Sequence, residues 1–214
     1  MYRKEADPYA LARAGMVDRI ACAGGFSRTV LSAMERVPRH LFVSEALRYR
    51  AYEDVSLPIG HSQTITKPTT VARMVQALDL RGNEHVLEIG TGSGYQAAVL
   101  AGLADRVTTC ERIEELFARA RDTLLFRLGL PNVTVVHNGD FTPPGGPYDG
   151  VIVAAVASDL PDELFDALND GGSLVIPVRQ GAGQSIRRYV KSGGKLFEDE
   201  LGRARFVPLV SPAR

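Results

Sequence analysis

The sequence has no tryptophan, only two cysteines in 214 residues, and no hydrophobic run as long as a membrane span. Cys22 and Cys110 lie far apart without metal-ligand spacing, so we expect a reducing compartment, no disulfide framework and no metal site. Charged residues within the first seven positions argue against a signal peptide. These absences predict a cytoplasmic protein that makes no use of a membrane.

The sequence also lacks net charge, because its 25 basic residues balance its 25 acidic residues. Nothing in this balance demands a polyanion, so we do not expect a nucleic-acid partner. The charges are unevenly placed, since basic residues prevail in 1–50 and 179–214 and acidic residues prevail in 51–178. Basic flanks suit an acidic substrate, although scattered solvated arginines explain them equally well. The sequence gives no indication of the oligomeric state.

One stretch organises the rest of the chain, the ten residues Val86–Tyr95 with the sequence VLEIGTGSGY. A short apolar run of strand type is followed by glycines at positions 90, 92 and 94, and then by a helical pattern. Glycine suits such a turn because it reaches positive φ without strain and lets a ligand approach the backbone. A glycine-rich turn alone is weak evidence, because nucleotide-binding folds of many kinds contain one.

Three acidic residues follow or end consecutive predicted strands, namely Glu88, Glu111 and Asp140. In a parallel sheet these positions share the edge where ligands bind. A carboxylate at Glu88 suits an ammonium group, and Glu111 suits the two hydroxyls of a ribose. Asp140 suits an adenine amino group, with the backbone N–H of Phe141 on a ring nitrogen. Together they predict a site for an amino acid fused to a nucleoside, which is S-adenosylmethionine. The alternatives are a solvated Glu88 and a turn-forming Asp140.

Hydrophobic periodicity predicts an alternation of helices and strands over most of the chain. We expect helices over about residues 9–22, 28–37, 42–47, 69–78, 96–103, 114–128 and 162–168. We expect strands over 86–89, 107–110, 133–136, 150–153, 173–178, 186–190, 195–197 and 206–209. Strand–helix alternation with almost continuously apolar strands is typical of a parallel sheet.

The predicted fold is therefore α/β, a Rossmann-like, doubly wound and mostly parallel sheet with antiparallel strands at its C-terminal end. We expect a single domain over 1–214, built around the predicted S-adenosylmethionine site. Its parts are an N-terminal helical layer (1–50), a substrate loop and helix (51–80), the cofactor-binding core (81–178) and the C-terminal strands (179–214). The helical layer has too little apolar surface to fold alone.

The helical pattern breaks between Tyr52 and Pro68, where prolines, a glycine and several hydroxyl residues predict one long loop. Long ordered loops in compact domains are often functional. His61 is the only histidine in this loop, and we interpret it as a structural residue. Thr66, near the end of the loop, is positioned to cap the helix that follows Pro68.

These residues resemble a known family, the protein-L-isoaspartate O-methyltransferases, over nearly the whole chain. The glycine-rich stretch is shared by methyltransferases in general, whereas the loop Leu57-Pro-Ile-Gly followed by Gln63-Thr-Ile-Thr66 is specific to the family. Further matching segments are 37–43, Glu111-Arg112-Ile113, Gly139-Asp140, 147–149, 171–172, 176–178 and 206–209.

The resemblance implies methyl transfer from S-adenosylmethionine to the side-branch carboxylate of an isoaspartyl residue in a damaged protein or peptide. The ester then collapses to a succinimide, which reopens partly to normal aspartate. By the same resemblance Thr66 is the catalytic hydroxyl residue near the methyl group, and Ile65 and Val207 lie beside the substrate backbone. The cofactor-binding residues that follow are Glu88, Gly90, Thr91, Gly92, Ser93, Gly94, Glu111, Arg112, Asp140 and Phe141.

The chain departs from the family pattern at three places. Thr66 replaces a serine, Phe141 replaces a glycine with a shortened segment from there to Pro147, and 153–157 matches loosely. The short segment borders the substrate side and favours an alternative, a tailoring O-methyltransferase that esterifies an aspartate-type carboxylate in a peptide or metabolite. A second alternative is a non-catalytic member of the fold that binds a nucleoside. Against it stand the intact Glu88, Gly92, Glu111 and Asp140.

Overall fold

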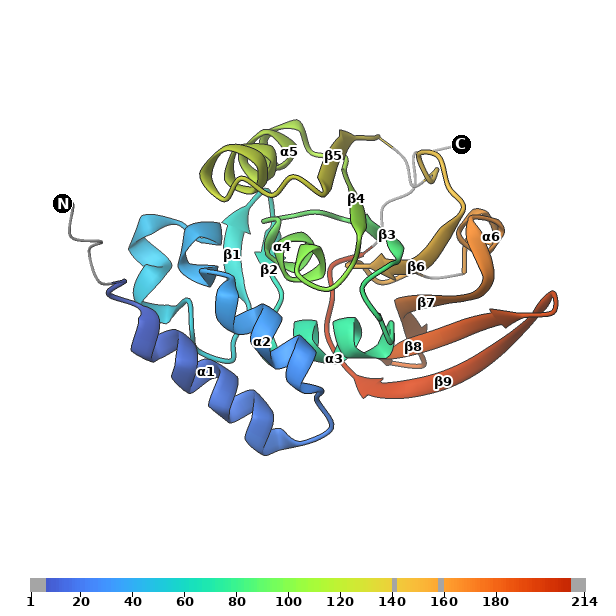
Figure 1. Cartoon of the computed structure of the whole chain (residues 1–214), viewed down its shortest axis with the longest axis horizontal. Coiled ribbons are helices and arrows are strands. Elements are labelled where there is room, and N and C mark those ends of the chain that lie inside the picture. Colours follow the sequence, from blue (N-terminus) through green and yellow to red (C-terminus); the bar gives the residue numbers. More distant parts are fainter. Residues whose placement is uncertain (1–6, 140–141, 158–159, 209–214) are drawn as a thin grey trace.

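The computed structural model describes residues 7–139, 142–157 and 160–208 of the chain (Figure 1). Its α-helices are α1 (Ala10–Ala23), α2 (Arg28–Arg36), α3 (Pro68–Ala77), α4 (Tyr95–Ala101), α5 (Glu114–Arg121) and α6 (Asp162–Asp166). Short 3₁₀-helices are η1 (Arg39–Phe42) and η2 (Glu45–Arg50), and η3 (Asp122–Arg127) is a π-helical continuation of α5. The strands are β1 (Leu57–Gly60), β2 (Gln63–Ile65), β3 (His85–Ile89), β4 (Arg106–Glu111), β5 (Val133–His137), β6 (Tyr148–Val153), β7 (Leu168–Gln180), β8 (Gly183–Ser192) and β9 (Lys195–Arg203).

Seven strands form the main sheet in the order β5-β4-β3-β6-β7-β8-β9. Strands β3 to β7 pair in parallel, whereas β8 and β9 are antiparallel, which confirms the predicted mixed sheet. The order reverses between β3 and β6, so this position is the topological switch point at which open α/β sheets bind ligands. In Figure 1, β8 and β9 extend away from the rest of the molecule.

The two faces of the sheet carry alternating residues of the same strands. Val86 of β3 packs in the larger core together with residues of α1 to α5, whereas the next residue, Leu87, packs in a smaller core that includes Leu164 of α6. Both side chains have no exposed surface. Successive side chains of a strand point to opposite faces of the sheet, and both faces of the central strands are buried. These strands are therefore apolar at almost every position.

The N-terminal helices form the predicted layer against the larger core. Ser27 caps α2, since its hydroxyl oxygen accepts a hydrogen bond of 3.3 Å from the backbone nitrogen of Val30. The helix expected around Phe42 is instead a pair of 3₁₀-helices, η1 and η2, separated by Val43 and Ser44. They are four and six residues long, and 3₁₀-helices are common as such short connectors.

Two further predictions are corrected by the structure. The segment predicted as one long loop contains the antiparallel hairpin β1–β2, whose two-residue turn has both His61 (φ 52°) and Ser62 (φ 57°) in the left-handed region. The strand expected at 206–209 is absent over its described residues, which make one isolated bridge between Val156 and Pro208. A proline has no N–H to donate, so it cannot continue a ladder.

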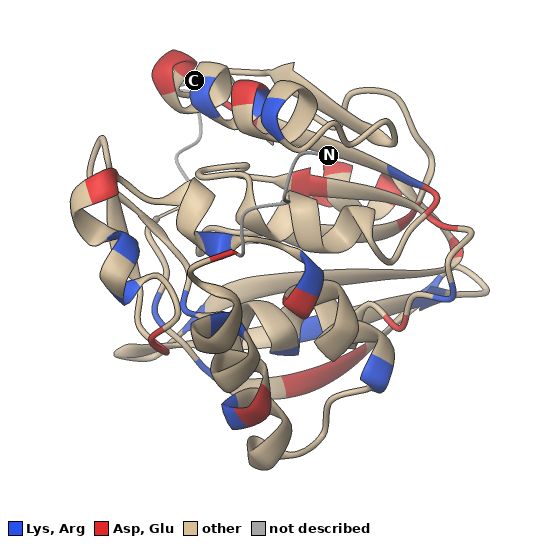
Figure 2. Cartoon of the chain, turned by 60° about the vertical axis from the view of Figure 1, so that its left-hand side comes forward, with Lys and Arg blue, Asp and Glu red and all other residues tan. Residues whose placement is uncertain are grey.

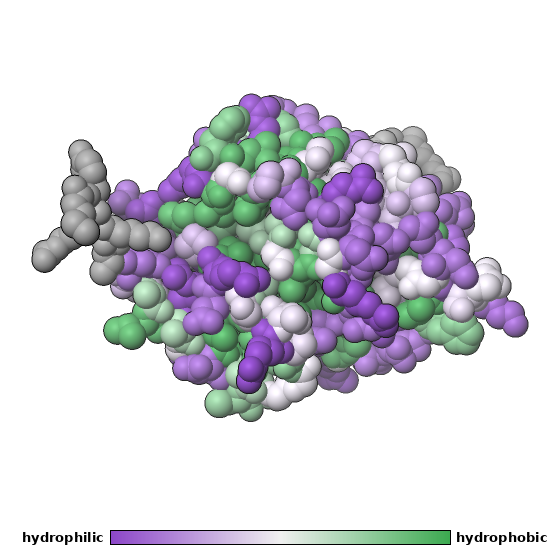
Figure 3. All heavy atoms as spheres, viewed as in Figure 1, coloured by the Kyte–Doolittle hydropathy of each residue, from purple (hydrophilic) through white to green (hydrophobic). Residues whose placement is uncertain are grey.

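Charged residues of both signs are spread over the molecule (Figure 2). Lys and Arg are interspersed with Asp and Glu in Figure 2. Hydrophobic and hydrophilic residues both occur on the face shown in Figure 3. Within the described part of the chain, no helix combines the length and apolar character that a bilayer crossing requires. A pocket lies at the switch point, where open α/β sheets bind ligands, and it is the main candidate for the functional site.

Candidate active site

The three glycines of the organising stretch form the turn between β3 and α4. Gly90, Gly92 and Gly94 all have positive φ, at 91°, 54° and 90° respectively, as the sequence predicted. Gly90 lies against Ala154, so that a Cβ there would come within 3.6 Å of the Ala154 methyl group. The backbone nitrogens of Gly90 and Thr91 both donate to the carbonyl oxygen of Cys110, which ties the turn to β4.

The side chain of Glu88 is buried inside the molecule and has no exposed surface. Gln96 donates to its Oε1 at 3.0 Å, and Thr109 donates to its Oε2 at 2.5 Å. Burial and, to a smaller extent, the nearby Glu111 raise the pKa of Glu88, and the two hydrogen bonds lower it, with a net rise to about 8. The interpretation of Glu88 as a solvated turn residue is therefore wrong.

Glu111 ends β4 and holds the glycine turn from the other side. Its Oε2 accepts a hydrogen bond from the Gly92 nitrogen at 2.8 Å, and its Oε1 accepts from the nitrogens of Arg112 and Ile113 at 3.0 and 2.9 Å. The side chain is buried but borders the pocket. Each carboxylate oxygen has further lone pairs, so Glu111 retains the capacity to accept from a ligand.

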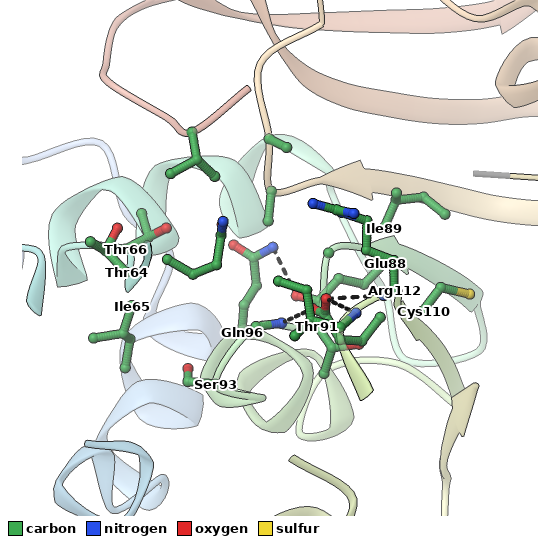
Figure 4. Close-up of a pocket in the computed structure, with 18 of the residues that line it drawn as sticks. Thr64, Ile65, Thr66, Glu88, Ile89, Thr91, Ser93, Gln96, Cys110 and Arg112 are labelled. Atoms are coloured by element: carbon green, nitrogen blue, oxygen red, sulfur yellow. Dashed lines mark hydrogen bonds between the residues drawn. The ribbon is translucent and has the colours of Figure 1, made fainter. Parts of the chain in front are cut away.

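The hairpin β1–β2 lies across the pocket from these carboxylates. Figure 4 shows Thr64, Ile65 and Thr66 on one side of the pocket and Glu88 with Arg112 on the other. Ile59 of β1 packs over the glycine turn, since a Cβ at Gly92 would lie 3.6 Å from its Cδ1. The Ile59 carbonyl accepts a hydrogen bond of 2.6 Å from Nη2 of Arg119, which fixes the hairpin to α5.

Thr66 does not cap α3, contrary to the sequence prediction. The residue at the cap position is Lys67, and no side chain at that position makes a cap hydrogen bond. Asp54 instead supplies the cap from the preceding loop, since its Oδ1 accepts from the Thr69 nitrogen at 2.8 Å. The Thr66 side chain, which is half-buried and borders the pocket, therefore has no part in holding this helix.

The C-terminal segment closes the remaining side of the pocket. The Val156 nitrogen donates to the Val207 carbonyl at 2.9 Å, and Val207 and Pro208 both border the pocket. Residues separated by more than a hundred positions, Ile65 and Val207, thus line the same cavity. The structure thus brings together the two residues that the resemblance assigns to the substrate.

One pocket brings together most of the predicted site residues. Its lining includes Ile65, Thr66, Glu88, Gly90, Thr91, Gly92, Ser93, Glu111, Arg112 and Val207. Gly94 does not line it, because Gly94 faces Leu124, whose Cδ1 would lie 3.2 Å from a Cβ there; its role is close packing against η3. Asp140 and Phe141 lie outside the described residues. Among the described residues, no three His, Cys, Asp or Glu side chains gather as metal ligands would.

Two polar residues that hold Glu88, Gln96 and Thr109, were not predicted from the sequence. Gln96 lines the pocket from the first turn of α4, while Thr109 lies beside Glu88 in the register of β3 and β4. The spacing of eight residues from Glu88 to Gln96 is a detectable signal, because a strand–turn–helix returns the chain to that point. Thr109 carries no such signal without knowledge of the strand pairing.

The residues present fit the expected cofactor. A buried carboxylate held only by two neutral donors favours a cationic partner, which lowers the cost of its ionisation. The positive-φ glycines allow close approach of a ligand to the backbone, and Glu111 supplies acceptors at the end of the next strand. An amino acid joined to a nucleoside matches this order of groups.

The order of the parallel strands reverses beside the glycine turn, and each of the two adjacent strands β3 and β4 carries a carboxylate that lines the pocket. These features define a Rossmann-like methyltransferase of class I. A family model described as Protein-L-isoaspartate(D-aspartate) O-methyltransferase (PCMT) matches residues 14–214. The chain therefore belongs to the protein-L-isoaspartate O-methyltransferase family.

Individual relatives agree with this assignment over the full length. A protein-L-isoaspartate O-methyltransferase of Methanoculleus marisnigri is 45% identical over 210 residues, which cover 96% of this chain and 94% of that protein. One of Geobacter metallireducens is 48% identical over 204 residues, covering 94% of each chain.

Solved structures extend the similarity to the fold. A structure of a protein-L-isoaspartate O-methyltransferase has a TM-score of 0.82 at 26% identity and covers 92% of this chain and 65% of that one. A Plasmodium falciparum structure described as a beta-aspartate methyltransferase in complex with S-adenosyl-L-homocysteine has a TM-score of 0.80 at 24% identity. It covers 92% of this chain and 98% of that one.

Proposed function

We propose that this chain methylates the side-branch carboxylate of L-isoaspartyl residues in damaged proteins and peptides, with S-adenosylmethionine as the cofactor. The observation that carries the proposal is one pocket lined by Glu88 and Glu111 on one side and by the hairpin residues Ile65 and Thr66 on the other. Family membership over residues 14–214 supports both the reaction and the cofactor.

The cofactor supplies an activated methyl group on a sulfonium. In our proposal Glu88 accepts from its ammonium group, Glu111 accepts from its ribose hydroxyls, and the backbone of the turn from Gly90 to Ser93 lies against it. Asp140 and the Phe141 backbone N–H are proposed for the adenine, because they follow the third predicted strand and Gly139-Asp140 matches the family pattern. The S-adenosyl-L-homocysteine in the similar Plasmodium structure supports a ligand of this shape.

The protein needs no general base for this reaction. A carboxylate has a pKa near 4 and is already the nucleophile at pH 7. The tasks left to the chain are alignment and the exclusion of water, and good alignment alone contributes roughly 7–11 kcal/mol to lowering a barrier. We propose that the Thr66 hydroxyl orients the carboxylate by one hydrogen bond, while Ile65 and Val207 flank the substrate backbone.

The fate of the product tests the proposal. An isoaspartyl peptide incubated with the protein and S-adenosylmethionine should yield a methyl ester, then a succinimide, and finally the aspartyl peptide, each separable by chromatography. The same peptide without cofactor should remain unchanged over the same time. An ester that forms on aspartyl peptides or on small carboxylic acids instead would favour the tailoring alternative.

The setting of the reaction is part of the proposal. We expect the protein to act in the cytoplasm, because its two cysteines are free, with Cys22 exposed and Cys110 buried, as suits a reducing compartment. We expect no nucleic-acid or membrane partner, since neither the charge balance nor a hydrophobic segment requires one.

A further inference from the structure

Thr109 touches two residues of the pocket without lining the pocket itself. Its hydroxyl lies 2.5 Å from Oε2 of Glu88 and 2.6 Å from the hydroxyl of Thr91. All three side chains are almost completely buried, with exposed fractions of 0% for Thr109 and Glu88 and 4% for Thr91. Thr109 therefore joins the ends of two different segments, β3 and the glycine turn.

When the cofactor is bound and Glu88 is ionised, the direction of these hydrogen bonds is fixed. An ionised carboxylate only accepts, so the Thr109 hydroxyl must donate its single proton to Glu88. The contact between Thr109 and Thr91 then requires the proton of Thr91. Thr91 is left with lone pairs only, and it borders the pocket beside Glu88. Both groups thus face the pocket as acceptors.

Two adjacent acceptors in a dry site select a ligand group with several donors and a positive charge. An ammonium group has three donors and no acceptor, so it satisfies both oxygens at once. Within the described residues no Lys, Arg or His forms an ion pair with Glu88, so the protein does not provide this cation itself.

We propose that Thr109 is a positioning residue for the cofactor, which holds the Glu88 carboxylate and the Thr91 hydroxyl as a pair of acceptors for the amino-acid ammonium group. This inference rests on the proposed function, because it assumes that Glu88 faces that end of the cofactor. Thr109 acts through its two neighbours and does not touch the ligand.

The test is calorimetric titration of the full chain with two ligands. S-adenosylhomocysteine carries the amino acid, whereas 5′-methylthioadenosine has the same nucleoside thioether without it. Thr109→Val keeps the shape of the side chain and removes its hydroxyl. It should lower the affinity for S-adenosylhomocysteine by roughly 10- to 100-fold and the affinity for methylthioadenosine by less than about twofold. Thr109→Ser should restore the affinity to within about threefold of wild type.

Thr108→Val is the matched control, because it removes a buried hydroxyl from the next residue of the same strand. That hydroxyl contacts Nε2 of His85 at 3.0 Å and not Glu88, so both affinities should stay at the wild-type value. Melting curves accompany each variant, and Thr109→Ala replaces Thr109→Val if the valine variant does not fold. If Thr109→Val lowers the affinity for both ligands equally, or changes neither affinity, the inference is overturned.

Glu88→Gln separates this inference from the proposed function. If Glu88→Gln lowers only the affinity for S-adenosylhomocysteine, and Thr109→Val leaves that affinity unchanged, the cofactor assignment stands and the role of Thr109 is refuted. If Glu88→Gln leaves the affinity for S-adenosylhomocysteine unchanged, the assignment of Glu88 to the ammonium group is itself wrong, and the role of Thr109 falls with it.

Discussion

Arg39 donates a hydrogen bond of 2.9 Å from Nη2 to the backbone carbonyl of Thr66, and so ties the substrate hairpin to the N-terminal helical layer. Its Nε donates to the Ala51 carbonyl at 2.8 Å, and its guanidinium lies 4.6 Å above the ring of Tyr95. The side chain has no exposed surface. Three segments that are distant in sequence therefore meet at one buried cation.

We predict that Arg39→Lys lowers the free energy of unfolding by about 1–3 kcal/mol, because a compact ammonium cannot reach both carbonyls as the planar guanidinium does. The loosened Thr66 should slow methyl transfer several-fold in single-turnover kinetics. Affinity for S-adenosylhomocysteine should change little, since neither Ala51, Thr66 nor Tyr95, which Arg39 contacts, is among the residues proposed for the cofactor. Wild-type stability and rate in the variant would refute this role.

Glu111→Ala should weaken the binding of S-adenosylhomocysteine by about 1.5–3 kcal/mol, the range for a hydrogen bond to a charged group. The reason is its place at the end of β4, where it also accepts from the Gly92 nitrogen. Calorimetric titration measures the change. Glu115→Ala, an exposed carboxylate in α5, serves as the control and should bind as wild type does. Unchanged affinity in Glu111→Ala would remove the ribose assignment.

Affinity for S-adenosylhomocysteine should depend on pH through Glu88. Burial raises the pKa of Glu88 to about 8, so the carboxyl group holds a proton at neutral pH in the free protein. A bound ammonium favours the ionised form, and binding must therefore release that proton below pH 8. The affinity should rise with pH from 6 to 8, by at most about tenfold per unit, and then level off.

The control for this pH dependence is Glu88→Gln, which has no proton to lose at this position and should show a flat profile over the same range. Calorimetry in buffers with different ionisation enthalpies detects the released proton directly. A wild-type profile as flat as that of Glu88→Gln would show that Glu88 does not change its charge on binding.

Thr66→Val should slow methyl transfer by roughly five- to a hundred-fold, because one orienting hydrogen bond of about 1–3 kcal/mol is lost, whereas Thr66→Ser should remain active. Stability should stay close to the wild-type value in both variants, since Asp54 and not Thr66 caps α3. Asp54→Ala should in contrast cost about 0.5–2 kcal/mol of stability. Single-turnover rates and melting curves measure both effects, and a wild-type rate in Thr66→Val would exclude the catalytic hydroxyl.

The parts of the structure that local chemistry determines were predictable from the sequence. The apolar run before Gly90 and the glycines that follow it predicted the turn from β3 into α4, and Ser27 predicted the start of α2. The hairpin β1–β2 was not predicted, because its turn residues His61 and Ser62 adopt positive φ without the glycine or asparagine that normally indicates such a turn.

Contacts that depend on tertiary structure were out of reach. The hydrogen bond from Thr109 to Glu88 depends on the register of β3 against β4, and the bond from Arg39 to Thr66 joins residues 27 positions apart. Neither follows from periodicity. The cap of α3 was assigned to the wrong residue for the same reason, since Asp54 reaches it from an earlier loop.

A competition assay tests the central claim most directly. An isoaspartyl peptide and its aspartyl twin, mixed in equal amounts with the protein and limiting S-adenosylmethionine, give the ratio of their kcat/KM values from the methyl esters formed. Our account predicts that almost all of the methyl ester is found on the isoaspartyl peptide. Equal labelling of the two peptides, or labelling of the aspartyl peptide alone, would contradict it.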